Sequence, residues 1–126
     1  MYKQGDILLI PVPFTNLVSN KKRPVLVLSN DMYNSTKEDM VVVAITSNLK
    51  EKDYTILISN NDLIEGTLKL DSNIRVDKIY SLSQEIAIKK FGRVKDEIIT
   101  KVNIEIRKLI SLIFFLPLIC IGNLHR

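Results

Sequence analysis

The chain has 126 residues, of which 46% are hydrophobic and only 4 each are glycine and proline. This length is typical of a single domain with a substantial core, and the composition excludes disorder as the main state. A formal net charge of +4 weakly favours a polyanionic partner. The single cysteine, Cys120, excludes an intramolecular disulfide and is compatible with a reducing compartment, so we expect a cytoplasmic protein.

Four short runs rich in branched aliphatic residues are bounded by turn formers, and they predict buried strands. In chain order they are residues 6–12, 24–29, 40–47 and 54–59. The third run gives the strongest strand signal. The segment that follows the fourth run, residues 60–72, predicts a loop with a short extended piece at its end. Residues 73–83 alternate imperfectly between apolar and polar side chains, which predicts a half-buried strand.

The periodicity of the sequence changes at Asp96. Apolar residues now recur at steps of three and four, which places them on one stripe of a helix. These residues are Ile98, Ile99, Val102, Ile106, Leu109, Ile110 and Ile113. Asp96 and Glu97 suit the positive end of the helix dipole, and Gly92 predicts a break just upstream. Strands followed by one helix favour an α+β domain built on a small curled antiparallel sheet or half-barrel.

Neither end of the sequence predicts a targeting or membrane segment. The N-terminal apolar run is short, is broken by two prolines and lacks a small-residue cleavage pattern. The apolar run at residues 109–121 contains Pro117 and is shorter than the roughly 20 residues that cross a bilayer. We expect residues 1–116 to form the domain and residues 117–126 to form an apolar tail that packs on it.

The residue types exclude several kinds of site. One cysteine and one histidine, His125, cannot form a zinc site of the usual kind, and there is no glycine-rich phosphate loop. The lone histidine also excludes a Ser-His-Asp hydrolase in practice, together with histidine-based RNA cleavage. We therefore expect no metal and no cofactor. Any chemistry must use Arg, Lys, Asp, Glu, Thr, Ser or Tyr.

Three polar groups interrupt the apolar strands. Arg23 stands directly before a proline at the beginning of one strand. Thr46 and Ser47 end the most apolar strand. Arg75 and Asp77 point to the same face of another strand, because they lie two residues apart. Taken singly, each has a simpler interpretation: a solvated loop, ordinary strand-end hydroxyls, and a surface ion pair that contributes little to stability.

Taken together, these groups and their flanking residues resemble the MazF/PemK family of toxin endoribonucleases from bacterial toxin–antitoxin systems. The matching stretches are residues 5–17, 22–31, 41–48, 66–79 and 89–102. The features most specific to this family are the Gly-Asp opening, the Arg-Pro-Val strand and the Ile-Thr-Ser strand end, and they are specific only in combination. Their order and spacing cover roughly residues 4–112.

The resemblance implies an SH3-like curled antiparallel sheet, the MazF/PemK/CcdB-like toxin fold, with a C-terminal helix. It also implies a homodimer with RNA sites at the dimer interface. The implied activity is sequence-specific, metal-independent cleavage of single-stranded RNA. A cognate antitoxin is the implied protein partner, and we expect neither membrane association nor direct DNA binding without that antitoxin.

The resemblance also implies roles for individual residues. Arg23 corresponds to the catalytic arginine of the family, and Thr46 to its strand-end threonine. PemK-type members use an arginine and an aspartate two residues apart, which correspond to Arg75 and Asp77. Attack of a 2′-hydroxyl on phosphorus needs positive charge, a proton donor and a proton acceptor. The planar guanidinium of Arg23 can supply the positive charge, and Thr46 can donate a hydrogen bond. Asp77 is the carboxylate best placed to be the base.

Four further residues are the expected RNA-binding residues. They are Lys21, Lys22, Ser47 and Asn48. The sequence departs from the family at three positions. The loop before Arg23 lacks the acidic residue of some members, Tyr80 replaces a common arginine, and Lys95 stands where a serine often begins the last helix. The first departure leaves the identity of the general base open.

Two other functions are compatible with the same fold, because fold alone does not determine function. Gyrase-poisoning toxins share this architecture and act by binding a protein without chemistry. A degenerate family member would bind RNA or an antitoxin without cutting. The Arg-Pro and Ile-Thr-Ser residues favour the nuclease over both.

Overall fold

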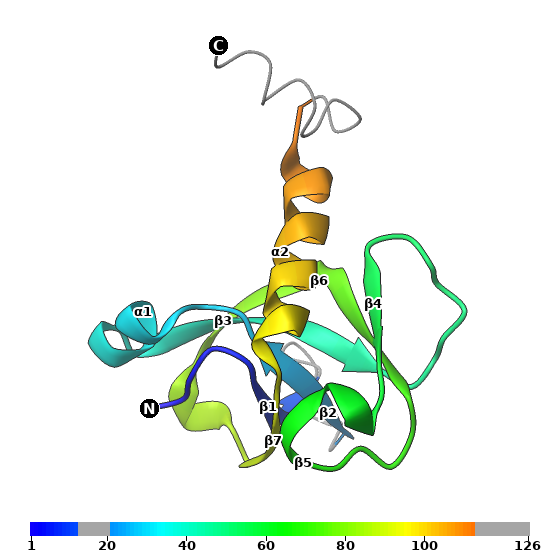
Figure 1. Ribbon diagram of the computed structural model, residues 1–126. Coiled ribbons are helices and arrows are strands. Elements are labelled where there is room, and N and C mark those ends of the chain that lie inside the picture. Colours follow the sequence, from blue (N-terminus) through cyan, green and yellow to red (C-terminus); the bar gives the residue numbers. More distant parts are fainter. Residues whose placement is uncertain (13–20, 113–126) are drawn as a thin grey trace.

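The computed structural model describes residues 1–12 and 21–112 of the chain, and its strands form one sheet in the order β4-β6-β3-β2-β1-β7-β5. The strands are β1 (Asp6–Val12), β2 (Lys21–Val27), β3 (Asp39–Thr46), β4 (Thr55–Ile58), β5 (Leu63–Gly66), β6 (Ser72–Ser83) and β7 (Lys89–Val94). The helices are α1 (Asp31–Thr36) and α2 (Asp96–Ile110), with 3₁₀ turns η1 (Asn60–Asp62) and η2 (Gln84–Ile86). All paired strands are antiparallel, and the sheet curls into a half-barrel (Figure 1), as predicted.

Two clusters of buried side chains cover the two faces of the central strands. The first lies under α2 and includes Ile7, Leu26, Val43, Ile45, Ile58, Ile74, Val76, Val94, Ile98 and Val102. The second lies on the opposite face and consists of Leu8, Ile10, Val25, Val27, Met40 and Val42. Strands buried on both faces need apolar residues at every position. This explains why the runs in β1, β2 and β3 are continuously apolar rather than alternating.

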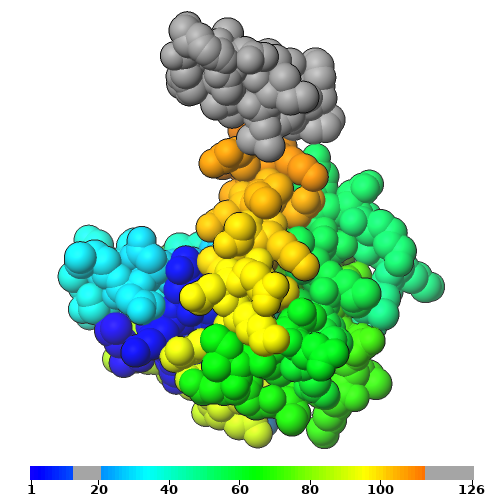
Figure 2. Space-filling model, viewed as in Figure 1, coloured from blue at the N-terminus to red at the C-terminus, as the bar shows by residue number. Residues whose placement is uncertain are grey.

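Helix α2 packs on the face of the sheet that carries the first cluster. Ile98 and Val102, one turn apart, are its buried residues, and its first turn carries Asp96 and Glu97 as predicted. The space-filling view in Figure 2 shows the N-terminal half of α2 lying against the body of the protein. Toward its end the apolar stripe is exposed, and Ile110 is 74% accessible. No helix in the described part of the chain has the length and apolar character to cross a membrane.

Strand β6 contains a bulge that explains its imperfect alternation. Val43 pairs with Ile79, whereas its neighbour Ala44 pairs with Arg75, so three residues of β6 lie between successive partners. Ile74, before the bulge, is buried, while Ile79, after it, is exposed. A bulge bends a strand and redirects its side chains. The bulge therefore sets the direction of the segment that carries Asp77.

The Gly5-Asp6 opening ties β1 to β7. The carboxylate of Asp6 is buried, and its Oδ1 accepts a hydrogen bond from Nε of Arg93 at 3.1 Å and lies 3.3 Å from Nζ of Lys90. The other oxygen accepts from the backbone N–H of Lys3 at 2.9 Å. A buried carboxylate is tolerated when it is paired and hydrogen-bonded in this way. The role of this motif in the structure is therefore to hold two strands together.

The sequence prediction missed helix α1 and strand β7 and misplaced strand β5. Helix α1 follows Asn30, which caps it by accepting a hydrogen bond from the backbone N–H of Tyr33. Strand β5 lies near the middle of segment 60–72, not at its end as expected. Gly92, expected to be a break, lies inside β7, where it pairs with Ile7 of β1. The predicted tail, residues 117–126, lies outside the described residues.

Candidate active site

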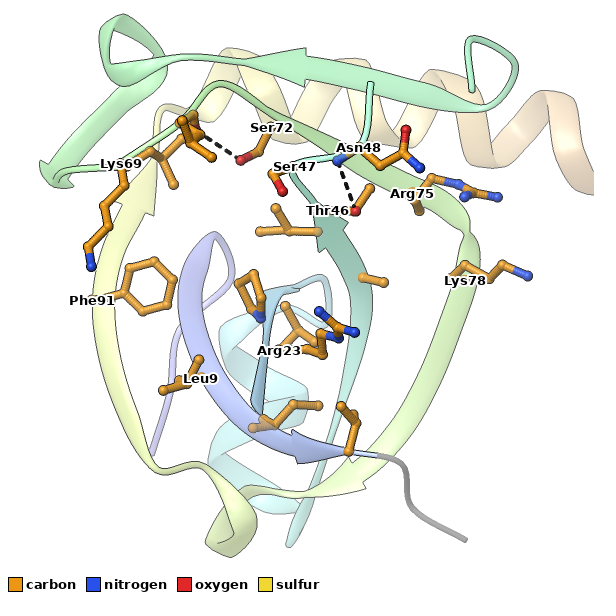
Figure 3. Close-up of a pocket in the computed structure, with 18 of the residues that line it drawn as sticks. Leu9, Arg23, Thr46, Ser47, Asn48, Lys69, Ser72, Arg75, Lys78 and Phe91 are labelled. Carbon is orange, nitrogen blue, oxygen red and sulfur yellow. Dashed lines mark hydrogen bonds between the residues drawn. The ribbon is translucent and has the colours of Figure 1, made fainter. Parts of the chain in front are cut away.

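A cavity of about 880 Å³ lies among the curled strands of the sheet (Figure 3). Strands β1, β2, β3, β6 and β7 and the segment between β5 and β6 contribute side chains to it. Its polar and charged lining residues are Arg23, Thr46, Ser47, Asn48, Thr67, Lys69, Ser72, Arg75, Lys78, Tyr80 and Lys89. The cavity therefore collects residues from positions that are widely separated in the sequence.

Arg23 projects into the cavity from the beginning of β2. Its backbone pairs with Ile10 of β1, and the following Pro24 pairs with Leu9. A residue that precedes proline is restricted to extended conformations, so Pro24 limits the backbone freedom of Arg23. Because Val25 pairs with Ala44, continuing that register by two residues brings Arg23 opposite Thr46. The predicted arginine and threonine both line the cavity, from strands that pair with each other.

Thr46 begins a hydrogen-bonded turn at the end of β3. Its hydroxyl oxygen accepts from the backbone N–H of Asn48 at 3.1 Å. The Asn48 side chain in turn accepts from the backbone N–H of Lys50 at 3.0 Å. Because a hydroxyl can accept and donate at once, the proton of Thr46 remains available to donate. The turn therefore orients Thr46 without using its donor.

Arg75 and Asp77 form a two-pronged ion pair beside the β6 bulge. Nε of Arg75 donates to Oδ1 of Asp77 at 3.1 Å, and Nη2 donates to Oδ2 at 3.0 Å. Hydrogen bonding to Arg75 lowers the pKa of Asp77 below its usual range, and the same bonds raise the pKa of Arg75. A carboxylate with a lowered pKa is a weaker proton acceptor. Arg75 lines the cavity, whereas Asp77 is not among the described lining residues.

The charged groups that line the cavity are all positive. They are Arg23, Lys69, Arg75, Lys78 and Lys89, and no aspartate or glutamate is among the lining residues that the structure describes. Within the described residues, no ion pair neutralises Arg23, Lys69 or Lys89. Clefts lined by one sign of charge attract ions of the opposite sign. The cavity is therefore suited to a polyanion.

The structure brings most of the predicted site residues together. Arg23, Thr46, Ser47, Asn48 and Arg75 line the one cavity. Lys21 and Lys22 precede Arg23 on β2 but do not line it, and their expected contact with RNA stays a prediction. Across residues 1–12 and 21–112, no group of three or more His, Cys, Asp or Glu side chains could hold a metal ion.

The sequence prediction missed many of the lining residues, among them Lys69, Lys78, Lys89 and Phe91. Lys78 could have been found, because it adjoins the predicted Asp77 in the sequence. Lys89 and Phe91 reach the cavity only because β7 pairs with β1, where Leu9 is the partner of Lys89. No local pattern in the sequence indicates that pairing.

The chain was compared with curated protein sequences and with solved structures. Comparison of the sequence with curated proteins finds no match. Among solved structures, an endoribonuclease in complex with its cognate antitoxin from a mycobacterial species is similar with a TM-score of 0.73 and 18% identity, over 90% of this chain and 98% of that one. MazF from Deinococcus radiodurans is similar with a TM-score of 0.70 and 18% identity, over 88% and 97% of the two chains.

A third structure, the Mycobacterium tuberculosis toxin MazF-mt6, has a TM-score of 0.68 and 16% identity, over 86% of this chain and 98% of that one. At these identities the likeness shows the fold. The family is shown by sequence, because the family model for the PemK-like, MazF-like toxin of type II toxin–antitoxin systems matches residues 3–110. The resemblance drawn from the sequence is thereby confirmed, and the chain belongs to the PemK-like, MazF-like family of type II toxin–antitoxin toxins.

Proposed function

We propose that this toxin is an endoribonuclease that cuts single-stranded RNA without a metal ion. The observation that carries the proposal is the cavity that Arg23 and Thr46 both line, where the described lining residues include four further cations and no carboxylate. Family membership supports the same activity, since similar structures are endoribonucleases. RNA is the substrate class because the attacking group is the ribose 2′-hydroxyl, which DNA lacks.

The proposed reaction is an internal displacement. The 2′-hydroxyl loses its proton to a base as its oxygen attacks the adjacent phosphorus. The bond to the 5′-oxygen breaks and that oxygen takes a proton from water, which leaves a 2′,3′-cyclic phosphate and a 5′-hydroxyl. Arg23 would hold two non-bridging oxygens and stabilise the charge that develops on the phosphorane. Thr46 would donate a hydrogen bond to the same phosphate. Both groups project from strand ends, so little reorganisation accompanies the reaction.

Asp77 is proposed as the proton acceptor, with a smaller effect than Arg23. Its carboxylate is engaged by Arg75, and the resulting low pKa makes it a weak base. Arg75 faces the cavity and would contact the phosphate backbone while it orients Asp77. Lys21, Lys22, Ser47 and Asn48 are the further proposed RNA contacts, and of these Ser47 and Asn48 line the cavity.

The proposed protein partner is an antitoxin with an acidic segment that covers the cavity. The cationic lining offers charge complementarity to such a segment. A similar mycobacterial endoribonuclease has been solved with its cognate antitoxin. An interaction of this kind weakens as salt concentration rises.

Incubation of the purified protein with single-stranded RNA in excess EDTA tests the proposal. We expect cleavage that leaves 2′,3′-cyclic phosphate ends, and no cleavage of DNA of the same sequence. Mass spectrometry of the fragments identifies both new ends. Intact RNA, with wild-type protein that is folded, would overturn the proposal and favour a toxin that acts by binding.

A further inference from the structure

Phe91 is the extra residue of a bulge in β7. Ile7 pairs with Gly92, whereas the next residue of β1, Leu8, pairs with Lys90, so Phe91 has no partner across the strands. Bulges commonly redirect a side chain next to a functional site. Here the redirected ring lines the cavity, where Figure 3 shows it on the opposite side of Arg23 from Arg75.

The ring of Phe91 is held in place by its surroundings. It is half-buried, and it packs against the core cluster beneath α2. The backbone on either side is also paired: Lys90 pairs with Leu8 of β1, and Gly92 pairs with both Ile7 of β1 and Gly66 of β5. A ring that is already ordered loses little conformational entropy when a flat ligand stacks on it.

The surroundings of the ring indicate which ligand it accepts. Leu9 and Leu68, both half-buried, line the same cavity as the ring. Lys69 and Lys89 are exposed beside it, and neither is paired with a carboxylate of the described residues. A flat apolar surface next to cations is complementary to a nucleotide, whose base stacks while its phosphate meets the positive charge.

We infer that Phe91 is a stacking platform for a base next to the scissile phosphate, with Lys69 and Lys89 holding the adjoining phosphate. This inference rests on the proposed function, because it takes single-stranded RNA as the occupant. Arg23 lies between this subsite and the Arg75–Lys78 side (Figure 3), so a strand that crosses the cavity passes over Arg23. Stacking on an aromatic ring accepts every base, so the subsite anchors the strand with little sequence preference.

A single tryptophan tests for stacking directly, because the chain has no natural tryptophan. We expect a 12-nucleotide 2′-O-methyl RNA, which cannot be cut, to quench the fluorescence of a Phe91→Trp variant in a saturable way. The control is Tyr33→Trp on α1, outside the cavity, whose fluorescence should not change. Unchanged fluorescence of Phe91→Trp, or equal quenching of the control, would overturn the inference.

Affinity separates stacking from simple apolar packing. By fluorescence anisotropy with the same oligonucleotide, Phe91→Leu should bind about 5- to 150-fold more weakly than wild type, the range for loss of one stacked base. Leucine keeps the apolar bulk, so the variant remains folded and lacks only the aromatic face. Wild-type affinity for Phe91→Leu would overturn the inference.

The salt dependence of binding tests the two lysines. Lys69→Gln and Lys89→Gln should each reduce the slope of log affinity against log salt by about 0.7, the value for one phosphate contact on a single strand. Lys37→Gln, next to α1 and outside the cavity, should leave the slope unchanged. Equal slopes for all three variants would overturn the assignment of these lysines.

The failure of this inference and the failure of the proposed function give different results. RNA cleavage by the wild type, with unquenched fluorescence of Phe91→Trp, would overturn the stacking subsite alone. Saturable quenching of the variant without cleavage by the wild type would support the subsite and overturn the nuclease. Quenching of Phe91→Trp by an acidic peptide but not by the oligonucleotide would assign the subsite to a protein partner and overturn the inference.

Discussion

The exposed guanidinium of Arg23 projects from a backbone that is fixed on both sides. Pro24 restricts the residue before it, and Ile10 of β1 pairs with Arg23 itself. An arginine in a loop would reach the same phosphate from many conformations. One at a paired strand position samples fewer of them, which favours stabilisation of a transition state over binding of the ground state.

Substitution of Arg23 should therefore affect the rate more than the fold. We expect Arg23→Ala to lower the cleavage rate by at least about a hundredfold, the scale seen when one transition-state donor is lost. Arg23→Lys should recover little of the lost rate, because an ammonium group cannot reproduce the two parallel hydrogen bonds of a planar guanidinium. Thr46→Ala should lower the cleavage rate less than Arg23→Ala, because a neutral donor contributes a weaker hydrogen bond than a charged one. Single-turnover kinetics measure all three, and near-wild-type rates for folded Arg23→Ala would contradict the proposed role.

The Arg75–Asp77 pair leads to a prediction about pH. Because hydrogen bonding to Arg75 lowers the pKa of Asp77 in the folded protein, the pair stabilises the fold at pH values above the ordinary pKa of 3.8. That stabilisation is lost as pH falls through the lower, folded-state pKa. Both side chains are partly exposed, so its size should be below about 1 kcal/mol.

Urea unfolding of wild type and Asp77→Asn measures this effect. The difference in free energy of unfolding should be constant from about pH 5 to 8 and should shrink below about pH 4. The cleavage rate of the same variant tests the proposed base, and we expect a smaller loss than for Arg23→Ala. A difference in stability that grows as pH falls would contradict the ion pair.

At the scale of elements, β5 and β7 approach each other more closely than side chains allow. Gly66 of β5 has φ +81°, and a Cβ on it would lie 2.1 Å from the carbonyl oxygen of Phe91. A Cβ on Gly92 of β7 would lie 2.9 Å from the carbonyl oxygen of Glu65. Glycines at both positions therefore permit the contact that fixes the backbone around Phe91.

Gly66→Ala should destabilise the protein more than Gly5→Ala. Gly5 also has a positive φ, +93°, but a Cβ there would have no atom nearer than 3.5 Å. The left-handed conformation alone costs about 1–2 kcal/mol for alanine, which is the expected loss for Gly5→Ala. The additional clash at Gly66 should raise the loss further. Urea denaturation of both variants checks this order, and equal losses would contradict it.

At the scale of the whole molecule, apolar side chains remain exposed beside the two open edges of the sheet. Leu57 lies on the edge strand β4 and Ile64 on the edge strand β5, and they are 59% and 57% exposed. The last turns of α2 expose Ile104 and Ile110 as well. Unpaired strand edges and exposed apolar groups favour association.

We predict that the protein is a homodimer, as the family resemblance implies. Size-exclusion chromatography with light scattering should give about twice the chain mass of 14.4 kDa. Association that buries apolar surface should persist in high salt, because screening weakens only its charged contacts. A monomer at micromolar concentration would contradict this prediction.

Local patterns in the sequence were enough to predict the continuously apolar strands and the helix that begins at Asp96, and to identify the family. Each of these depends on residues close together in the chain: an apolar run, a three-and-four periodicity, an arginine before a proline. The same local signals named Arg23, Thr46 and Arg75, which the structure brings to one cavity. Asn30 and Asp31 also predict a helix start, and α1 could have been found from them.

The β7 side of the cavity depends on tertiary structure and is not indicated by local sequence. Strand β7 contains Lys89, Lys90, Gly92 and Arg93 and so carries little apolar signal of its own, because its stability comes from pairing with β1 and β5 and from the Asp6 ion pairs. The side on which Phe91 emerges depends on a bulge, where one additional residue reverses the direction of a side chain. Such a shift is set by the partner strand, which is distant in the sequence, and local periodicity therefore does not contain it.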